Sequence, residues 1–388
     1  MSLMFRVVFL VTCFTHVTLA SSQFLTISDI HYGSHNTSRD GKDTGSKLLA
    51  ITFAKFKQLS KDVDFILTLG DLPTHSFGYS PEKSGYEETV FHGFFVADTQ
   101  HKPMFYVSGN NDSLSGNYQP FESEGKSPLN YAHDWSGACI HCKGLIIDDT
   151  HMRKSGYYST YVIPNNHELI LIVLNATQWT KTSIFMPKYP NQEQDALTQL
   201  HWLKNQLKKH HAKQLLIAMH EPPGNDHRGN PFWHRNYLQQ FINILEHNQH
   251  AYGEISLLTA HTHMDELRTI HLHEGKNIYA YSTPAVSRIH HNNSAMKRFN
   301  LDAQMHIKNF TTYYTTSTQK WGNQHYKALN SADAIFPKCQ NKTLPQCLDK
   351  LSDKQVCSAL ESGLFYGVKS SRVPNNVCRN QYRVDLVT

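Results

Sequence analysis

The sequence predicts a layered α/β fold whose functional site lies along one edge of its sheets. Short apolar runs alternate with segments of helical periodicity along most of the chain. Polar side chains of the kinds that bind metal ions follow five of these apolar runs. Alternating strands and helices are typical of layered α/β proteins, which place their sites where the carboxyl ends of strands meet. At 388 residues the chain is also long enough to bury a substantial core.

The strands and helices follow from the periodicity of the apolar residues. Short apolar runs predict strands at 23–28, 63–69, 103–107, 168–174, 214–219, 255–259 and 277–281, with further strands up to 302. Apolar residues at helical spacing predict helices at 46–61, 87–100, 195–209 and 233–247. The segment 113–153 lacks a period and is expected to be a long irregular insertion near the mouth of the site. The part from about 319 onward is expected to be a small helical subdomain.

Residues 1–20 have the features of a secretory signal peptide. Arg6 precedes an apolar stretch, and small residues lead up to an expected cleavage after Ala20. The apolar stretch is too short to span a bilayer, and a buried first strand or helix is the alternative reading. The sequence therefore predicts an exported protein, in an extracellular, periplasmic or lysosomal location that depends on the organism.

The cysteines support an oxidising destination. Cys13 leaves with the signal peptide, and six cysteines remain: Cys139, Cys142, Cys339, Cys347, Cys357 and Cys378. An even number in an exported chain favours disulfides. Their clustering predicts one local bridge between Cys139 and Cys142, and two bridges among the four C-terminal cysteines. A redox or zinc pair at Cys139 and Cys142 is the alternative, but no second pair at zinc-ribbon spacing follows.

Five predicted strand ends contribute seven candidate metal ligands. In chain order they form Asp-x-His, Gly-Asp, Gly-Asn, an isolated His and His-x-His: Asp29, His31, Asp71, Asn110, His220, His261 and His263. Two neighbouring divalent ions need about this many ligands when one carboxylate bridges them. Each motif alone is weak, because polar residues are common in loops. Chance is a poor explanation for all five motifs in this order.

Composition restricts the class of substrate. The formal net charge is +5, and the sequence has no long basic run. This mild positive balance favours a small anionic substrate and does not predict a nucleic-acid groove, which needs a concentrated basic stripe. The 26 histidines are spread along the whole chain, so only those at strand ends count as candidate ligands.

With these motifs in place, the sequence resembles the calcineurin-like metallophosphoesterases, and among them the acid sphingomyelinase-like phosphodiesterases. Four blocks match that subfamily: Gly70-Asp-Leu-Pro-Thr-His75, His220-Glu-Pro-Pro-Gly224, His261-Thr-His-Met-Asp-Glu266 and Ser282-Thr-Pro-Ala-Val-Ser287. The resemblance covers about 23–314, and the tail resembles the C-terminal subdomain of the subfamily. It implies a four-layer α/β/β/α sandwich over 21–318, a subdomain over 319–388, and a metal-dependent phosphoric diester hydrolase.

The resemblance also implies roles for the candidate ligands. Two divalent ions are expected, with zinc favoured over iron or manganese. One ion would be bound by Asp29, His31, Asp71 and His263, and the other by Asp71, Asn110, His220 and His261. A hydroxide that bridges the two ions would then attack phosphorus in line.

One departure from the family concerns the proton donor. Most relatives have a histidine directly after the metal-binding Asn, where this chain has Asn111, which cannot protonate a leaving oxygen. Asn111 can still donate a hydrogen bond to phosphate. The subfamily assigns leaving-group protonation to a histidine four residues after the bridging Asp, which is His75 here. A surface histidine in a loop is the other reading of His75.

The second departure concerns the substrate. Asp29 follows the expected cleavage site by nine residues, so the lipid-presenting domain of acid sphingomyelinase is not expected before it. Soluble phosphodiesters, such as nucleotides and compounds like cytidine-diphosphate-choline, are therefore expected. Two alternatives stay open: a sphingomyelin phosphodiesterase with peripheral lipid contact, and a secreted binding protein that keeps its metals without turnover. A purple-acid-type monoesterase would have a tyrosine at Thr74 and is disfavoured. The enzyme is expected to be a monomer.

Overall fold

The structure is a computed structural model, and it describes residues 21–33, 41–75, 81–181, 189–272, 276–315, 328–363 and 383–384. The predicted signal peptide and Cys378 lie outside the described residues. None of the helices within these ranges is both long enough and apolar enough to cross a membrane.

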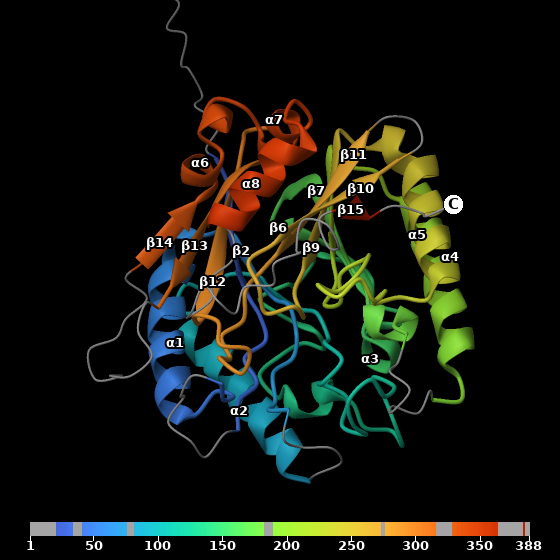
Figure 1. Ribbon diagram of the computed structural model, residues 1–388. Coiled ribbons are helices and arrows are strands. Elements are labelled where there is room, and N and C mark those ends of the chain that lie inside the picture. Colours follow the sequence, from blue (N-terminus) through green and yellow to red (C-terminus); the bar gives the residue numbers. More distant parts are fainter. Residues whose placement is uncertain are drawn as a thin grey trace, which may run out of the picture.

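Two facing β-sheets form the centre of the molecule, and helices cover both outer faces (Figure 1). On one side lie α1 (Ser46–Leu59) and α2 (Pro81–Ala97). On the other side lie α4 (Gln192–Lys209) and α5 (Arg235–Asn248). This arrangement confirms the predicted α/β fold with helices on both sides of a pair of sheets.

The first sheet has seven strands, and its centre is parallel. Its order is β14 (Ala328–Ser331), β13 (Ile307–Tyr314), β12 (Ala295–Leu301), β1 (Gln23–Ile27), β2 (Phe65–Thr68), β3 (Met104–Tyr106) and β4 (Cys139–Ile140). β1, β2 and β3 run parallel, with Leu25 beside Ile66 and Ile66 beside Met104. Their carboxyl ends therefore lie at the same edge of the sheet.

The second sheet has eight strands and a parallel centre of its own. Its order is β15 (Arg383–Val384), β10 (Leu267–His271), β11 (Asn277–Ser282), β9 (Glu254–Thr259), β8 (Gln214–Ala218), β7 (Asn166–Val173), β6 (Tyr158–Ile163) and β5 (Ile146–Asp148). β7, β8, β9 and β11 run parallel. This sheet therefore also gathers strand ends at one edge.

Strand β7 shows why the apolar runs are continuous. Leu169, Leu171 and Val173 belong to the core shared with the first sheet. Ile170 and Ile172, which alternate with them, belong to a second core that also contains buried residues of α4 and α5. Because both faces of the strand are buried, it has no polar face and reads as an unbroken apolar run.

Some elements differ from the expectation. Helix α2 begins at Pro81 rather than at residue 87, since proline is well suited to the first turn of a helix. Strand β10 was not expected, because the buried Arg268 interrupts its short apolar pattern. The segment 113–153 is only partly irregular, since β4 pairs with β3 and β5 pairs with β6. Strands of two or three residues are too short to show a period.

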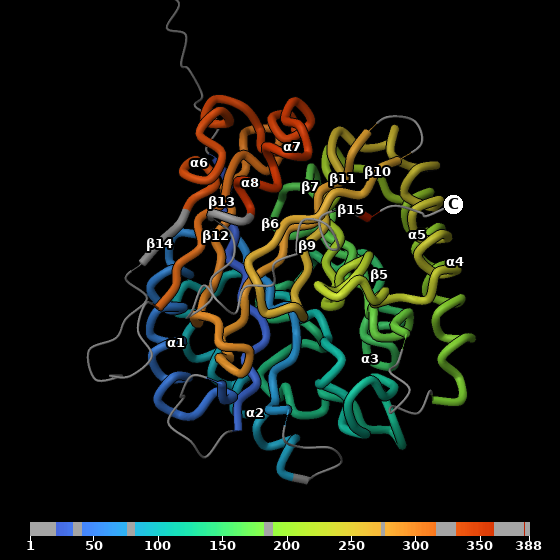
Figure 2. Tube along the Cα trace, viewed as in Figure 1, coloured from blue at the N-terminus to red at the C-terminus, as the bar shows by residue number. Residues whose placement is uncertain are grey.

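The described C-terminal part contains helices and strands. The helices are α6 (Ala332–Ile335), η6 (Pro337–Cys339), α7 (Leu344–Leu348) and α8 (Asp353–Gly363). They gather at one end of the molecule, in orange and red in Figure 2. In addition, β14 pairs with β13 and β15 pairs with β10, so this part extends both sheets. The subdomain boundary at 319 remains a prediction.

Two of the predicted disulfides are present in the described residues. Cys139 is bonded to Cys142, as the local clustering predicted. Cys339 is bonded to Cys347, which is one of the two bridges expected among the C-terminal cysteines. Disulfides of this kind favour an oxidising compartment.

Candidate metal centre

The seven predicted ligands all follow the carboxyl ends of parallel strands. Asp29 and His31 follow β1, Asp71 follows β2 and Asn110 follows β3, while His220 follows β8, and His261 and His263 follow β9. Five of the seven have left-handed backbone angles: Asp29 (φ 47°), His31 (47°), Asp71 (55°), His261 (70°) and His263 (62°). Non-glycine residues rarely adopt this conformation, and such strain concentrates at functional sites.

Asp29 lies at the centre of three histidines. Its Oδ1 lies 3.7 Å from His31 Nε2, 3.7 Å from His220 Nε2 and 3.3 Å from His263 Nε2. Its Oδ2 accepts hydrogen bonds from Ser28 Oγ at 2.7 Å and from the backbone N–H of His261 at 3.3 Å. Ser28 and the His261 backbone therefore orient the carboxylate so that Oδ1 points at the histidines.

Asp71 is positioned between the two groups of ligands. Its Oδ2 lies 3.5 Å from His31 Nε2 and 3.3 Å from His220 Nε2. Its Oδ1 accepts a hydrogen bond from the backbone N–H of Asn111 at 2.8 Å. One carboxylate oxygen thus faces a histidine of each predicted metal site, which is the arrangement that a bridging ligand requires.

Backbone carbonyls fix the orientation of two histidine rings. His31 Nδ1 donates a hydrogen bond to the carbonyl of Pro73 at 3.0 Å, and His220 Nδ1 donates to the carbonyl of Leu69 at 2.6 Å. Because a carbonyl can only accept, the proton of each neutral ring is on Nδ1. The Nε2 lone pair is then directed into the centre, as in metal-binding histidines.

Several polar atoms at the centre are buried and have no hydrogen-bond partner within the described part of the chain. They are Asp29 Oδ1, Asn110 Oδ1 and His220 Nε2. Asn110 Nδ2 donates to Asn117 Oδ1 at 2.6 Å, which leaves its own oxygen available. Buried polar atoms are nearly always satisfied, so this set of orphaned donor and acceptor atoms fits bound metal ions.

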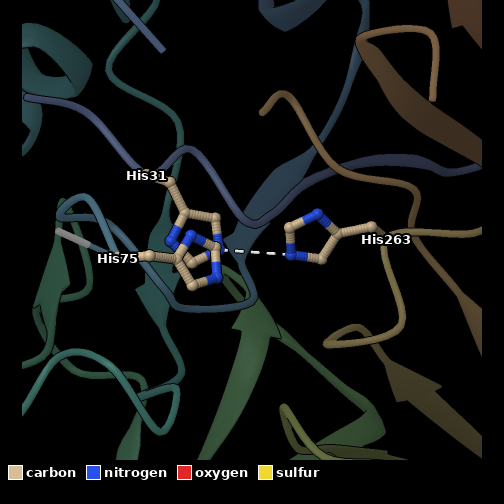
Figure 3. Close-up of side chains that lie close together, drawn as sticks. All are labelled: His31, His75 and His263. Atoms are coloured by element: carbon tan, nitrogen blue, oxygen red, sulfur yellow. Dashed lines mark hydrogen bonds between the residues drawn. The ribbon is translucent and has the colours of Figure 1, made fainter. Parts of the chain in front are cut away.

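The candidate ligand atoms form overlapping groups within 4.8 Å. One group consists of Asp29, His31 and Asp71, and a second of Asp71, His220 and His261. A third group consists of His31, His75 and His263. The Nε2 atoms of His31 and His263 lie 3.2 Å apart, and Figure 3 shows them facing each other. Because the first two groups share Asp71, the geometry suits two neighbouring ions better than one.

The electrostatics of the centre favour bound cations. Burial alone would raise the pKa of Asp29, but His263 and His220 hold that pKa well below its ordinary value. Burial opposes protonation of His220, yet Asp71 and Asp29 raise its pKa well above the usual range. Burial and the charge of His220 lower the pKa of His261 to about 3. Metal ions would replace the proton on His220 and compensate the buried carboxylates.

Two glycines allow the loops of the centre to approach each other. A Cβ on Gly109 would lie 2.2 Å from Asp71 Oδ1, and a Cβ on Gly70 would lie 2.3 Å from the backbone nitrogen of Gly109. Real Cβ atoms essentially never come this close to other heavy atoms. The Gly-Asp and Gly-Asn motifs are therefore required by backbone contact between the two loops.

Asp112 connects the same two loops, although no sequence motif indicates a role for it. Its carboxylate accepts backbone hydrogen bonds from Asp71 at 3.0 Å, Leu72 at 2.7 Å and Gly109 at 2.7 Å. The hydroxyl of Tyr106 donates a fourth at 2.8 Å. Its place two residues after Asn110 was the one available signal, but spacing alone could not show what it contacts.

His75 lies against the centre. Its ring stacks on that of His31 with a centroid distance of 3.7 Å (Figure 3), and its side chain is 31% exposed. Its Nδ1 donates to Asp43 Oδ1 at 3.0 Å. Asp43 also accepts from Thr74 Oγ1 at 2.8 Å and from Ser287 Oγ at 2.9 Å. No sequence motif marked Asp43, which lies 32 positions from His75.

Asp43 is ionised in this setting. Burial would raise its pKa, but the hydrogen bond from His75 and the charges of His31 and His75 hold the pKa of Asp43 far below its ordinary value. A permanent negative charge therefore faces the Nδ1 side of the His75 ring. This fixes the tautomer, because Nδ1 must carry a proton to donate to it.

The side-chain amide of Asn111 is buried and donates its hydrogen bonds to the protein backbone. It is 1% exposed, and its Nδ2 donates to the carbonyls of Pro73 at 2.7 Å and Thr74 at 3.0 Å. Both amide hydrogens therefore hold the backbone that precedes His75. The predicted contact of Asn111 with phosphate remains a prediction.

Comparison with known proteins gives the family. The calcineurin-like phosphoesterase model matches residues 22–265, which is more than half of the chain. No curated protein matches the sequence.

Solved structures to which this chain is similar include that of PhoD (12% identity, 80% of this chain and 69% of that chain covered, TM-score 0.48). A dimetal phosphatase from Danio rerio is 13% identical over 80% of this chain and 98% of its own, with a TM-score of 0.45. A 5'-nucleotidase from Candida albicans is 12% identical over 87% of this chain and 57% of its own, with a TM-score of 0.42. All three TM-scores lie below 0.5, so these likenesses add nothing to the match of the family model. From the match of the family model, the chain belongs to the calcineurin-like phosphoesterase family, which implies a metal-dependent phosphoester hydrolase.

Proposed function

We propose that the protein is a secreted dinuclear-metal phosphodiesterase of the acid sphingomyelinase-like type. Its proposed substrates are soluble compounds with phosphodiester or phosphoanhydride bonds, such as nucleotides and cytidine-diphosphate-choline-like molecules. The main support is the set of buried, unpartnered ligand atoms arranged around Asp71. The disulfides are consistent with secretion.

Seven side chains would hold the two ions. The proposed first site is Asp29, His31, Asp71 and His263, and the second is Asp71, Asn110, His220 and His261. When bound, such ions supply Lewis-acid neutralisation of phosphoryl oxygens and an activated water at neutral pH. Zinc is proposed because imidazole donors outnumber carboxylates in the set, although iron and manganese accept the same ligand types.

His75 is the proposed proton donor to the leaving oxygen, and Asp43 is proposed to position it. With Nδ1 committed to Asp43, the Nε2 of His75 is the nitrogen free to exchange a proton. Stacking on His31 holds the ring next to the metal centre. Asn111 fixes the Pro73–Thr74 backbone and so supports the same histidine.

Thr74 supports a diesterase rather than a purple-acid-type monoesterase. A monoesterase of that type would have a metal-binding tyrosine at this position. Here the Thr74 hydroxyl donates a hydrogen bond to Asp43, the carboxylate proposed to position His75. The chain therefore offers no phenolate ligand at this point, and diesters are expected to be hydrolysed much faster than monoesters.

The test is a substrate panel on protein purified without chelator and analysed for metal content. Rates would be compared at matched concentration for bis-p-nitrophenyl phosphate, p-nitrophenyl phosphate, cytidine-diphosphate-choline and sphingomyelin in mixed micelles. The proposal expects the soluble diester and pyrophosphate substrates to be preferred. A strong preference for the monoester would indicate a purple-acid-type monoesterase instead. A strong preference for sphingomyelin would indicate a sphingomyelin phosphodiesterase. Bound metals without any turnover would leave the non-catalytic binding protein as the better explanation.

A further inference from the structure

Tyr118 reaches the candidate metal centre from the segment 113–153. Its backbone N–H donates to the carbonyl of Asn110 at 2.8 Å, and the neighbouring Asn117 accepts from Asn110 Nδ2 at 2.6 Å. Tyr118 itself has left-handed backbone angles, with φ 58°. The chain that follows Asn110 therefore folds back towards Asn110. This places Tyr118 at the edge of the metal centre.

The Tyr118 hydroxyl lies beside a candidate ligand atom. Its oxygen is 3.4 Å from His261 Nε2, and the two rings meet edge to face at 79°. In the ranges that the structure describes, His261 Nε2 is the hydrogen-bond partner found for this hydroxyl. His261 belongs to the candidate ligand group formed with Asp71 and His220.

Binding of a metal ion by His261 would leave the Tyr118 proton without this acceptor. A neutral histidine ring has one nitrogen with a proton and one with a lone pair. If Nε2 binds the ion, its lone pair can no longer accept from Tyr118. If Nδ1 binds the ion, Nε2 carries the ring proton and donates to the Tyr118 oxygen instead. In both cases the half-buried hydroxyl has a proton to donate and no acceptor at His261.

We propose that Tyr118 is a substrate-binding residue, whose hydroxyl donates a hydrogen bond to a phosphoryl oxygen of the substrate held at this centre. The inference rests on the proposed function, because it takes a phosphoester as the ligand. An anionic oxygen is the acceptor that suits a neutral hydroxyl at a site of bound cations. A fixed donor aimed at a phosphoryl oxygen also stabilises the charge that develops there during the reaction.

The protonation state of the hydroxyl agrees with this role. A tyrosine hydroxyl ordinarily titrates at about pH 10, so it is a neutral donor at the neutral and acidic pH values at which phosphodiesters would be assayed. It needs no general base and loses no proton in the proposed interaction.

The test uses inorganic phosphate as the probe. Zinc-loaded wild type and Tyr118→Phe would be titrated with phosphate by calorimetry, after their metal content is measured. We expect unchanged metal content and a dissociation constant for phosphate that is about tenfold higher in the variant, the usual scale for a hydrogen bond to a charged group. Tyr161→Phe is the matched control, since it removes the same atom from β6, where the ring stacks on His167. It should bind phosphate like the wild type.

Two results would overturn the inference. Equal phosphate affinity in wild type and Tyr118→Phe, with both metals retained, would show that the hydroxyl does not contact the anion. Loss of metal from Tyr118→Phe would show that it supports His261 instead. The proposed function is tested separately. If phosphate binding depended on Tyr118 while no phosphoester were hydrolysed, the hydrolase proposal would fail and the assignment of Tyr118 as an anion-binding residue would stand.

Discussion

His75 donates a hydrogen bond from Nδ1 to Asp43 Oδ1 over 3.0 Å, between residues 32 positions apart. The same carboxylate also accepts from the backbone N–H of His75 at 2.9 Å, so it fixes both the ring and the chain that carries it. An aspartate in this position resembles the orienting member of a catalytic triad, which holds the tautomer and direction of a histidine.

The first prediction concerns this pair. His75→Ala should slow diesters with alkoxide leaving groups by about a hundredfold to ten-thousandfold, the usual contribution of general acid catalysis. It should slow substrates that release p-nitrophenolate much less, because that group needs little protonation. Asp43→Asn should show the same dependence on the leaving group with a smaller loss. The measurement is kcat/KM over a series of diesters with graded leaving groups.

Asp134→Asn is the control for the Asp43 variant. Asp134 also accepts a hydrogen bond from a histidine, His92, but this pair lies on the surface, where the His92 side chain is 63% exposed. Its replacement should leave the rates unchanged. If His75→Ala slowed all leaving groups equally, His75 would be a residue that positions substrate or metal rather than a proton donor.

The second prediction concerns metal retention. Asp71→Asn should remove metal and activity together, because Asp71 Oδ2 faces the histidines of both groups and an amide is a much weaker metal ligand. Metal content after purification without chelator, together with the rate on bis-p-nitrophenyl phosphate, checks this expectation. Asp149→Asn, at an exposed position, should keep both. Full metal content and full rate in Asp71→Asn would rule out the bridging role.

The third prediction concerns the contact between the two ligand loops. Gly109→Ala should lower activity by more than a hundredfold, because a Cβ 2.2 Å from Asp71 Oδ1 must displace that carboxylate. Metal content should fall with it. Gly85→Ala is the matched control, since an added Cβ meets nothing within 4 Å and the residue is within α2. That change should be neutral or slightly stabilising. Normal metal content in Gly109→Ala would mean that the loops can separate at little cost.

The fourth prediction concerns pH and stability at a position remote from the ligands. Burial raises the pKa of Glu254 to about 7, against the hydrogen bond from Ser256. The folded protein then binds a proton that the unfolded chain has released, so stability is greatest below the ordinary glutamate pKa. It falls as the pH rises through about 7. The loss between pH 5 and pH 8 should be on the order of 2 kcal/mol.

Glu254→Gln should remove this part of the pH dependence. The measurement is the free energy of unfolding at pH 5 and pH 8 for wild type and variant under identical metal conditions. The exposed Glu124→Gln serves as a control that should follow the wild type. A wild-type difference between the two pH values that Glu254→Gln leaves unchanged would place the titration elsewhere.

Much of the architecture could be predicted because the signals are local. The parallel strands are buried on both faces, so β7, β8 and β9 read as apolar runs, and the polar residues that follow them mark their carboxyl ends. The candidate ligands Asp29, Asp71 and His220 were identified in this way. The ends of parallel strands share an edge of their sheet, so this linear pattern predicted that Asp29 and Asp71 would meet. His220 reaches them because the two sheets face each other in the tertiary structure.

The sequence by itself therefore determined the fold class, the order of the ligand motifs and the local disulfide between Cys139 and Cys142. Only the tertiary structure decided that Asp43 holds His75, that Asp112 joins two loops, and that Tyr118 lies beside His261. These contacts join residues that are far apart in the chain or that lie in segments without periodicity. A hydrogen bond between such residues depends on how the loops fold back in three dimensions, and it leaves no repeating pattern along the chain from which it could be predicted.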